Sequence, residues 1–347
     1  MVKNIWLNII QFYINAGFTF YYKKIKAHYE AEIPLDKPVL FLSNHQNALL
    51  DPLLITVKSK RKNHFLTRAS VFKNKYIASF LKSLQMLPVY RVRDSMSNIT
   101  KNHVIFSKCA SVLNQNKSII LFPEGSHSLD RTVRNLSKGF TRIISETQKK
   151  YPETKILIVP VGLNFQEPTK WADSVSIYFG KPIDTTLFFD KKGNLQIATL
   201  KEEVRNQIKD LTTHVNNSPR EQYLEKIKKL NTLQVDYTNP KAVNNCILNG
   251  FTYTGITTKS PSFLFKTLSL LLKIIFWLPY GVWRLYVTPK IKEAEFIGTF
   301  RYAVILTLTP LFLIIESILI SYFLSIKTGL LFFISVLVLS WITPKLR

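Results

Sequence analysis

A histidine and an aspartate follow the first strongly apolar run of the chain. Residues 38–42 have the length and composition of a buried strand, and His45 and Asp51 come directly after it. Asp51 can cap a helix, and Pro52 suits the first helical position. Two side chains six residues apart on one helix would point far apart, so we expect His45 to lie in the turn before the helix. A histidine held there by a carboxylate can act as a general base near neutral pH.

Three more short blocks follow in order. Leu87–Arg91 ends a predicted strand with an arginine, and Phe122–Ser126 joins a strand to a glycine-containing turn. Val159–Val161 lies in a third apolar run, where Pro160 is expected to be a fold element. An arginine can grip two oxygens of a phosphate, and backbone amides in a turn can cradle an anion. The blocks together therefore favour an enzyme.

The four blocks, in this order, resemble those of the PlsC-type glycerophosphate acyltransferase superfamily. The resemblance covers about residues 35–185 and implies an α/β fold of the glycerol-3-phosphate acyltransferase type, a mixed sheet flanked by helices. Most members have four residues between the histidine and the aspartate, whereas residues 46–50 make five here. This longer spacing resembles the branch that contains glycerol-3-phosphate and dihydroxyacetone-phosphate acyltransferases.

The resemblance implies a role for each site residue. His45 would take a proton from the acceptor hydroxyl, and Asp51 would hold its imidazole in one tautomer. No serine nucleophile is implied, so direct acyl transfer is expected. Acceptor binding is implied for four residues: Arg91, Glu124, Gly125 and Ser126. Arg91 as a solvated surface arginine, and Glu124 as a purely structural turn residue, remain alternatives.

One residue departs from the pattern of the superfamily. The usual arginine after the Gly-Thr/Ser pair is His127 here, which removes a permanent positive charge from this position. Arg131, Arg134 and Lys138 stand close enough in sequence to compensate. The other histidines show no metal-ligand spacing, and neither a metal nor a cofactor is expected beyond an acyl-CoA or acyl carrier protein donor.

Composition restricts the class of partner. The formal net charge of +25 requires an anionic partner, and the 46% apolar content favours anionic membrane lipid over nucleic acid. The two cysteines, Cys109 and Cys246, cannot build a disulfide framework and are expected to be buried without a catalytic role.

The C-terminal region predicts a membrane hairpin. Residues 302–323 are long and apolar enough to span a bilayer, and residues 328–342 are shorter but equally apolar. Basic residues flank both outer ends, which predicts that the catalytic part faces the cytoplasm. A buried hairpin of a soluble domain is the alternative. Residues 263–278 are expected to form an interfacial or re-entrant helix stopped by Pro279.

The N-terminus is also predicted to lie at a membrane. Polar residues recur on one stripe of a helix, and apolar residues cover the remainder: the stripe contains Asn4, Asn8, Gln11 and Asn15. The expected organisation is an interfacial helix over 1–30, a catalytic domain over 31–230, a linker or lid over 231–260 and a membrane-anchoring region over 261–347 with its hairpin at about 302–342. Strands are expected at 38–42, 63–67, 85–90, 118–122, 155–163 and 174–179.

The function expected from these observations is that of a membrane-bound acyltransferase of phospholipid biosynthesis. Its preferred acceptor is glycerol-3-phosphate because of the longer His–Asp spacing, and 1-acylglycerol-3-phosphate is the alternative. A non-enzymatic basic protein that binds membranes or nucleic acid is the competing class. It would explain the charge and the hairpin but not the ordered polar blocks.

Overall fold

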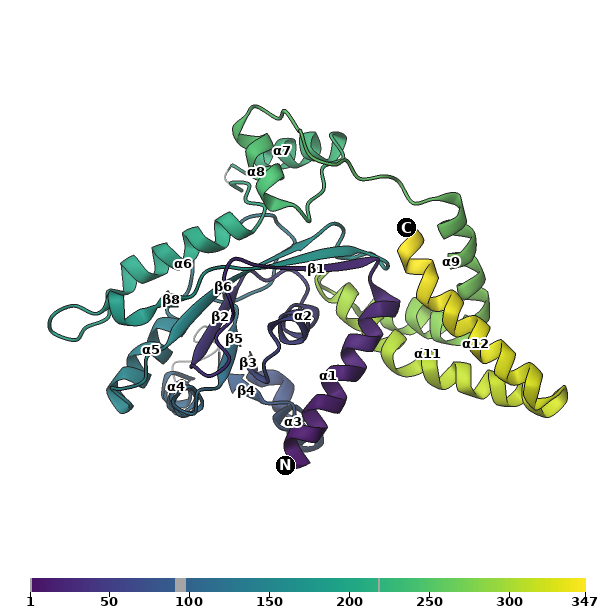
Figure 1. Cartoon of the computed structure of the whole chain (residues 1–347), viewed down its shortest axis with the longest axis horizontal. Helices are drawn as coiled ribbons and strands as arrows, with labels where there is room; N and C mark the ends of the chain where they lie inside the picture. The colour runs from purple at the N-terminus through teal and green to yellow at the C-terminus, as the bar shows by residue number, and fades with distance from the viewer. Residues whose placement is uncertain (1, 91–97, 218) are drawn as a thin grey trace.

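The computed structural model describes residues 2–90, 98–217 and 219–347, and its centre is one mixed β-sheet (Figure 1). Eight strands form it: β1 (Lys24–Tyr29), β2 (Val39–Ser43), β3 (Asn63–Arg68), β4 (Met86–Val89), β5 (Ser118–Leu121), β6 (Leu157–Phe165), β7 (Ser174–Phe179) and β8 (Ile183–Asp184). The order is β1-β7-β6-β2-β5-β3-β4, and β8 pairs with β6. The mixed sheet flanked by helices confirms the predicted fold class.

The six predicted strands are confirmed, with boundaries shifted by a few residues, whereas β1 and β8 were not predicted. β1 is an edge strand that pairs only with β7, and most of its side chains are exposed. Its alternating basic and apolar residues therefore carry no signal of a buried strand, although the pairing with β7 makes residues 24–29 part of the β-sheet.

The parallel part of the sheet brings the polar blocks to one edge. β2 pairs in parallel with β5 and β6, and β3 pairs in parallel with β5 and β4. The carboxyl ends of these five strands therefore lie at the same edge of the sheet. Ligand sites of open α/β sheets form at this edge.

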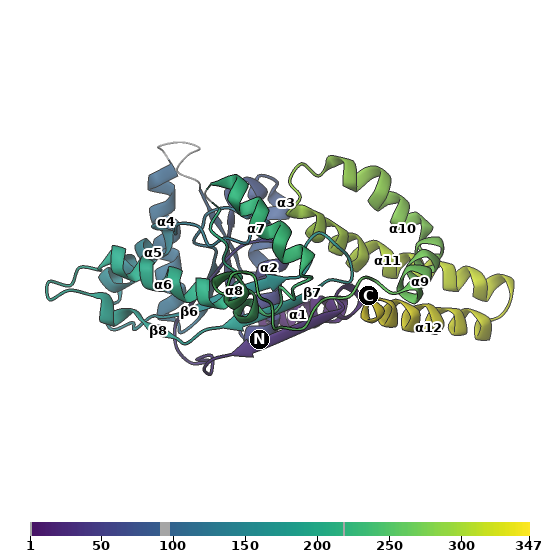
Figure 2. The same cartoon turned by 90° about the horizontal axis from the view of Figure 1, so that it is seen from above.

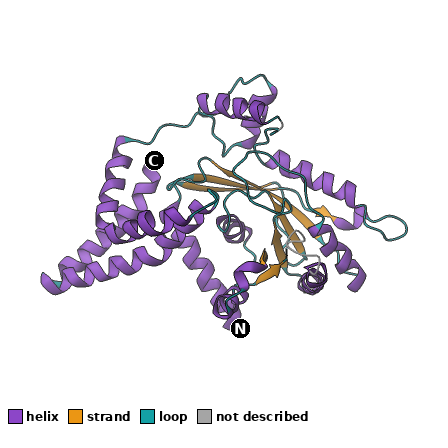
Figure 3. Ribbon diagram, turned by 180° about the vertical axis from the view of Figure 1, so that it is seen from behind, coloured by secondary structure: helices purple, strands orange, loops and turns teal. Residues whose placement is uncertain are grey.

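Both faces of the sheet are covered because β2 alternates its side chains between two cores. Val39 and Phe41 pack into one cluster, and Leu40 and Leu42 pack into the other. The first face carries α1 (Val2–Tyr21), α2 (Leu50–Ser59) and α3 (Lys75–Ser83), and the second carries α4 (Asn98–Asn114), α5 (Gly139–Lys150) and α6 (Ile197–Leu211). Figure 3 shows the sheet between these two helical layers.

Residues 231–260, expected as a linker or a lid, contain a helix and part of a third core. Together α7 (Arg220–Thr232) and α8 (Pro240–Leu248) enclose a small cluster that includes Tyr223, Val235 and Tyr237. Gln166, just past the end of β6, bonds the backbone of this unit twice, through Val235 O and Tyr237 N. In Figure 1 the unit lies beside the β-sheet.

The C-terminal region forms the predicted hairpin. α11 (Phe296–Phe323) and α12 (Ile326–Ile342) pack side by side and extend away from the sheet, as Figure 2 shows. Within the described residues, two helices are long and apolar enough to cross a membrane, and only 11% and 17% of their apolar windows are buried inside the protein. The alternative of a hairpin buried in a soluble domain is therefore wrong, because so much exposed apolar surface needs lipid around it.

Two further helices precede the hairpin. α9 (Phe263–Ile275) bends by 98° into the segment Trp277–Lys290, which begins with α10 (Trp277–Gly281), so the pair could form a third, broken span or a re-entrant loop. The prediction that Pro279 stops this helix is wrong, because α9 ends at Ile275 and Pro279 lies inside α10. The short helices of the chain are η1 (Ala69–Phe72), η3 (Thr185–Phe188), η4 (Val282–Val287), η5 (Thr288–Lys290) and η6 (Thr343–Leu346).

Helix α1 packs against both the β-sheet and α11. Its first half exposes Ile9 and Phe12, whereas Phe18 and Tyr21 near its end are buried against the sheet and Tyr302 of α11. The tyrosine hydroxyl of Tyr302 donates to Ile14 O at 2.6 Å. The N-terminal helix and the hairpin therefore pack together on the same side of the molecule.

Candidate active site

His45, in the turn after β2, contacts Asp51, the second residue of α2. The imidazole Nδ1 lies 2.7 Å from Asp51 Oδ2, and Asp51 is fully buried. The same oxygen accepts the backbone N–H groups of Gln46 and Asn47 at 2.7 and 2.8 Å. An ionised carboxylate can only accept, so Nδ1 carries the proton and Nε2 keeps its lone pair. This is the arrangement of a general base with its orienting carboxylate.

The predicted helix start needs a correction. α2 begins at Leu50, one residue before Asp51, and the Asp51 carboxylate does not cap the helix. It turns back to His45 and to the two amides upstream, because these donors are already within its reach. His45 does lie in the preceding turn, as predicted. Ala48 adopts a positive φ of 37° there, which lets the longer turn close on itself.

The His45 ring is held on both sides. It stacks on Phe122, which follows β5, with ring centroids 3.9 Å apart. His127 approaches it edge-on at 5.6 Å, and Ser128 N donates to His45 O at 2.9 Å. The side chain is 16% exposed, so it is fixed by its neighbours yet open to a small polar cavity.

The turn after β5 is braced by an arginine. Arg134 binds Glu124 with its Nε at 2.7 Å and binds Ser126 Oγ with its Nη1 at 2.8 Å. The Glu124 side chain is nearly buried; burial raises its pKa, and the neighbouring Arg134 charge acts in the opposite direction. Gly125 has a positive φ of 79°, which explains the glycine without any crowding at its Cα. The predicted residues Glu124, Gly125 and Ser126 are therefore brought together within one cation-stabilised turn.

Arg131 reaches the cavity that His45 lines. Its guanidinium stacks over the Tyr237 ring at 3.4 Å and donates to Gln166 O at 3.0 Å. No carboxylate of the described residues lies within ion-pairing distance of it. Sequence reasoning named Arg131 and Arg134 only as possible substitutes for the missing arginine. The structure brings both beside the site and leaves Lys138 exposed at the start of α5.

Arg91 lies outside the described residues, and the structure does not place it. Its neighbour Tyr90 lines a pocket of about 400 Å³ together with Arg68 and Lys73. Arg68 is the last residue of β3, so it stands at the same sheet edge as His45. Sequence reasoning missed it, although a basic residue directly after a predicted strand was the available signal.

His127 also contacts the segment before α11. Its Nε2 lies 3.4 Å from a carboxylate oxygen of Glu293, and its ring meets Phe296 edge-on at 4.8 Å. Glu295 completes a group whose possible ligand atoms all lie within 4.8 Å of one another. These three residues could hold a divalent cation. The two carboxylates are also ordinary partners for a protonated histidine.

The start of α11 lies against the active-site turn. Thr299 Oγ1 accepts the N–H of Leu49 at 3.1 Å, and a Cβ on Gly298 would lie only 2.5 Å from Asn47 Oδ1. Asn47 is buried and donates to Pro168 O at 3.0 Å. The first turn of α11 thus packs against residues 47–49, in the turn that follows His45.

Two comparisons with known proteins found a match. Residues 24–164 match the family model described as Acyltransferase. Among solved structures, the chain is similar to that of the 1-acyl-sn-glycerophosphate (LPA) acyltransferase PlsC from Thermotoga maritima, with 19% identity, a TM-score of 0.44, and coverage of 60% of this chain and 80% of that chain. The search of curated proteins found no match.

Residues 24–164 therefore match an acyltransferase domain, as the sequence blocks predicted, and the protein is an acyltransferase. The competing class, a non-enzymatic basic protein, is wrong. The two apolar C-terminal helices, α11 and α12, associate the acyltransferase with a membrane.

Proposed function

We propose that the protein transfers an acyl group from acyl-CoA or acyl carrier protein to glycerol-3-phosphate in phospholipid biosynthesis. The observation that carries the proposal is the 2.7 Å contact between His45 Nδ1 and the buried Asp51. It leaves Nε2 as the free base at the carboxyl edge of the sheet. The basic residues around this edge suit a phosphorylated acceptor.

The proposed reaction is a direct transfer. His45 Nε2 takes the proton of the acceptor hydroxyl while that oxygen forms a bond to the thioester carbonyl carbon. Asp51 stabilises the imidazolium that results. The tetrahedral intermediate then collapses, the carbon–sulfur bond breaks, and the thiolate recovers the proton from His45. No acyl-enzyme, metal or resident cofactor takes part.

The acceptor phosphate is proposed to lie on the far side of the base, toward β3 and β4. Arg91 was expected from the sequence to bind the acceptor, and the pocket lined by Tyr90 contributes Arg68 and Lys73. β3 is two strands from β2 and β4 is three, which is about 10 to 14 Å at the usual strand spacing. Long arginine side chains can bridge much of this distance to a small phosphorylated alcohol. The Glu124–Ser126 turn lies between the two positions, because β5 separates β2 from β3.

The choice of acceptor rests on the longer turn between His45 and Asp51. 1-Acylglycerol-3-phosphate is the alternative acceptor, since it brings the same phosphate and differs by one acyl chain. Both acceptors, and both acidic donors, would be attracted by the net charge of +25.

The catalytic domain is proposed to face the cytoplasm. Basic residues flank both outer ends of the hairpin, and the last ones bind the catalytic domain itself: Lys345 Nζ donates to Tyr22 O at 2.6 Å, and Arg347 donates to Trp171 O at 3.0 Å. Both ends of the hairpin therefore lie on the side of the sheet. The excess of positive charge on that side supports a cytoplasmic location.

The experiment is an acyl-transfer assay with purified membranes. Glycerol-3-phosphate, dihydroxyacetone phosphate and 1-acylglycerol-3-phosphate are offered separately, and the products are identified by mass. His45→Ala should reduce transfer by about 10²- to 10⁴-fold without changing the amount of protein in the membrane. His103→Ala, which changes an exposed histidine on α4, is the matched control. Retained transfer in His45→Ala would refute the mechanism, and turnover of only the acylated acceptor would refute the preferred substrate.

A further inference from the structure

A second cavity lies among the helices of the hairpin region. It has a volume of about 360 Å³, lies between α1, α9, α10, α11 and α12, and shares no lining residue with the polar cavity at His45. Ligand pockets have volumes of about 300–1,000 Å³. Along α11 its lining runs from Arg301 to Ile314, which is about 20 Å of helix. This extent suits one long hydrocarbon chain.

The walls of this cavity are mostly apolar, but two of its hydroxyl groups lack protein partners. Ser269 of α9 and Ser340 of α12 line it, and neither hydroxyl has a hydrogen-bond partner among the described residues. Ser269 is only 9% exposed. A buried hydroxyl without a partner is unfavourable, so these two side chains indicate a polar group in whatever fills the cavity.

One end of the cavity carries a cation. Arg301 lines it, donates Nη1 to Thr169 O at 2.8 Å and lies over the Trp283 ring at 4.9 Å. Across the described part of the chain, no carboxylate comes within ion-pairing distance of this guanidinium. Lys273 also lines the cavity, which adds a second positive charge. An apolar channel that begins at an unpaired arginine suits an amphiphile with an anionic head.

The cationic end is close in structure to the catalytic turn. Thr169, the acceptor for Arg301, follows Pro168, which accepts the side chain of Asn47 at 3.0 Å. Asn47 lies in the turn before α2 and donates its backbone N–H to Asp51 Oδ2. The Arg301 end of the cavity is therefore linked to this turn through two consecutive residues, Pro168 and Thr169.

We propose that this cavity binds a single-chain anionic lipid, with its hydrocarbon chain along α11 and its head group on Arg301. A lysophosphatidate and a free fatty acid share this chemistry, and they differ in carrying a phosphate or a carboxylate head. The inference rests on the proposed function in one respect only, since lysophosphatidate is the product of that reaction. Binding itself requires no catalysis.

The test measures lipid binding to the His45→Ala protein in detergent, where no turnover can confuse the result. The probes are 1-oleoyl-lysophosphatidate, oleate and the uncharged monoolein, each with a brominated chain that quenches tryptophan fluorescence. Trp171 and Trp283 line the cavity and report on its filling. We expect both anionic probes to bind at least about tenfold more tightly than monoolein, and the tighter of the two identifies the head group.

Two pairs of variants locate the binding. Arg301→Gln should weaken binding of the anionic probes by about tenfold or more, whereas Arg284→Gln, which removes an exposed charge nearby, should not. Ser340→Phe should fill the cavity and block all chain binding, whereas Ser335→Phe changes an exposed position on the same helix. Ala16→Phe fills the cavity from α1 and replaces Ser340→Phe if that variant does not fold.

Two results would overturn the proposal: monoolein binding as tightly as the anionic probes, or anionic binding that survives Arg301→Gln and both filling variants in folded protein. Because the measurement uses catalytically inactive protein, this failure is separate from any failure of the acyl-transfer assay.

Discussion

Asp51 Oδ2 accepts three hydrogen bonds, one from His45 and two from the backbone of the turn that contains His45. The carboxylate fixes both the tautomer of His45 and the path of residues 46 and 47. Sequence reasoning correctly put His45 in the turn before the helix that begins near Asp51. It assigned the cap wrongly, because a pattern of residue types cannot tell whether a carboxylate faces the helix after it or the turn before it.

Asp51→Asn should lower kcat by about 10²- to 10⁴-fold with little change in KM. An amide can occupy the same place, but it carries no negative charge to stabilise the imidazolium. The measurement is steady-state acyl transfer with glycerol-3-phosphate. Asp36→Asn, at an exposed aspartate, should leave both constants unchanged. An Asp51→Asn enzyme with wild-type kcat would show that the carboxylate is only structural.

The cationic residues show the limit of reasoning by sequence at this scale. Arg131 and Arg134 were two of three candidate replacements for a missing arginine. In the structure, Arg134 hydrogen-bonds to Glu124 in the turn after β5, and the Arg131 guanidinium stacks on the Tyr237 ring. Tyr237 comes from a part of the chain about a hundred residues later, so only packing could bring it to Arg131.

At the scale of elements, the contact between α11 and the catalytic turn has a direct consequence. Gly298→Val should reduce transfer activity and destabilise the protein by about 1–3 kcal/mol, because its Cβ would lie 2.5 Å from Asn47 Oδ1. Asn47 is buried and hydrogen bonded, so it cannot move aside freely.

Gly281→Ala is the matched control for this substitution, since a Cβ there meets no atom within 4 Å. It should be neutral or slightly stabilising in its helix. Activity and thermal unfolding in detergent are measured for both variants. Equal behaviour of the two would show that α11 does not position the turn.

The connection that leads into β7 contains a buried carboxyl group that should make stability depend on pH. Asp173 is 2% exposed, and burial raises its pKa from 3.8 to about 7. Unfolded protein loses this proton near pH 4, whereas folded protein keeps it until about pH 7. The folded state therefore binds more protons within this window, and the free energy of unfolding falls as pH rises through it.

Asp173→Asn should remove this dependence. The variant should be more stable than the wild type at pH 8, by at most about 4 kcal/mol, and should show no such gain at about pH 4. The amide oxygen can still accept the Glu167 N–H that Asp173 Oδ1 accepts at 2.8 Å. Denaturation in detergent at several pH values checks this. A constant difference between the two proteins at every pH would contradict the assignment.

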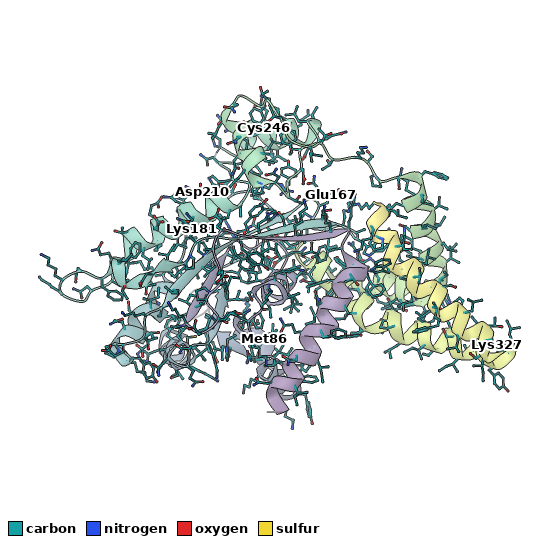
Figure 4. The ribbon with its side chains drawn as sticks, viewed as in Figure 1. Met86, Glu167, Lys181, Asp210, Cys246 and Lys327 are labelled. Carbon is teal, nitrogen blue, oxygen red and sulfur yellow. The ribbon has the colours of Figure 1, made fainter. Side chains whose placement is uncertain are left out.

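At the scale of the whole molecule, the hairpin determines how the enzyme sits in its membrane. Figure 4 labels Lys327 at the end of the hairpin that lies far from the sheet. If α11 and α12 cross the bilayer, this residue emerges on the face opposite to the catalytic domain. A Lys327→Cys protein should then react with an impermeant maleimide only from that opposite face.

The natural cysteines do not interfere with this measurement. Cys109 and Cys246 are both buried, as predicted, and burial raises the pKa of the Cys109 thiol to about 12. The wild type, labelled in vesicles of both orientations, is the control. Labelling of the introduced thiol from neither face would mean that the hairpin only dips into the bilayer, and labelling from the face of the catalytic domain would reverse the topology.

The sequence by itself determined the parts of this enzyme whose signals are local. Six strands, the pairing of His45 with Asp51 and the apolar hairpin were all predictable, because each depends on residue types within one short stretch. An edge strand such as β1 gave no such signal, since its exposed side chains need not be apolar.

Only the tertiary structure decided what the separate elements do to one another. The sequence does not show that the first turn of α11 supports the catalytic turn, or that Arg131 meets Tyr237 above the site. It also does not show that five helices line a cavity with Arg301 at one end. These features depend on close packing between segments distant in the chain, and packing is set by the complementary shapes of whole surfaces.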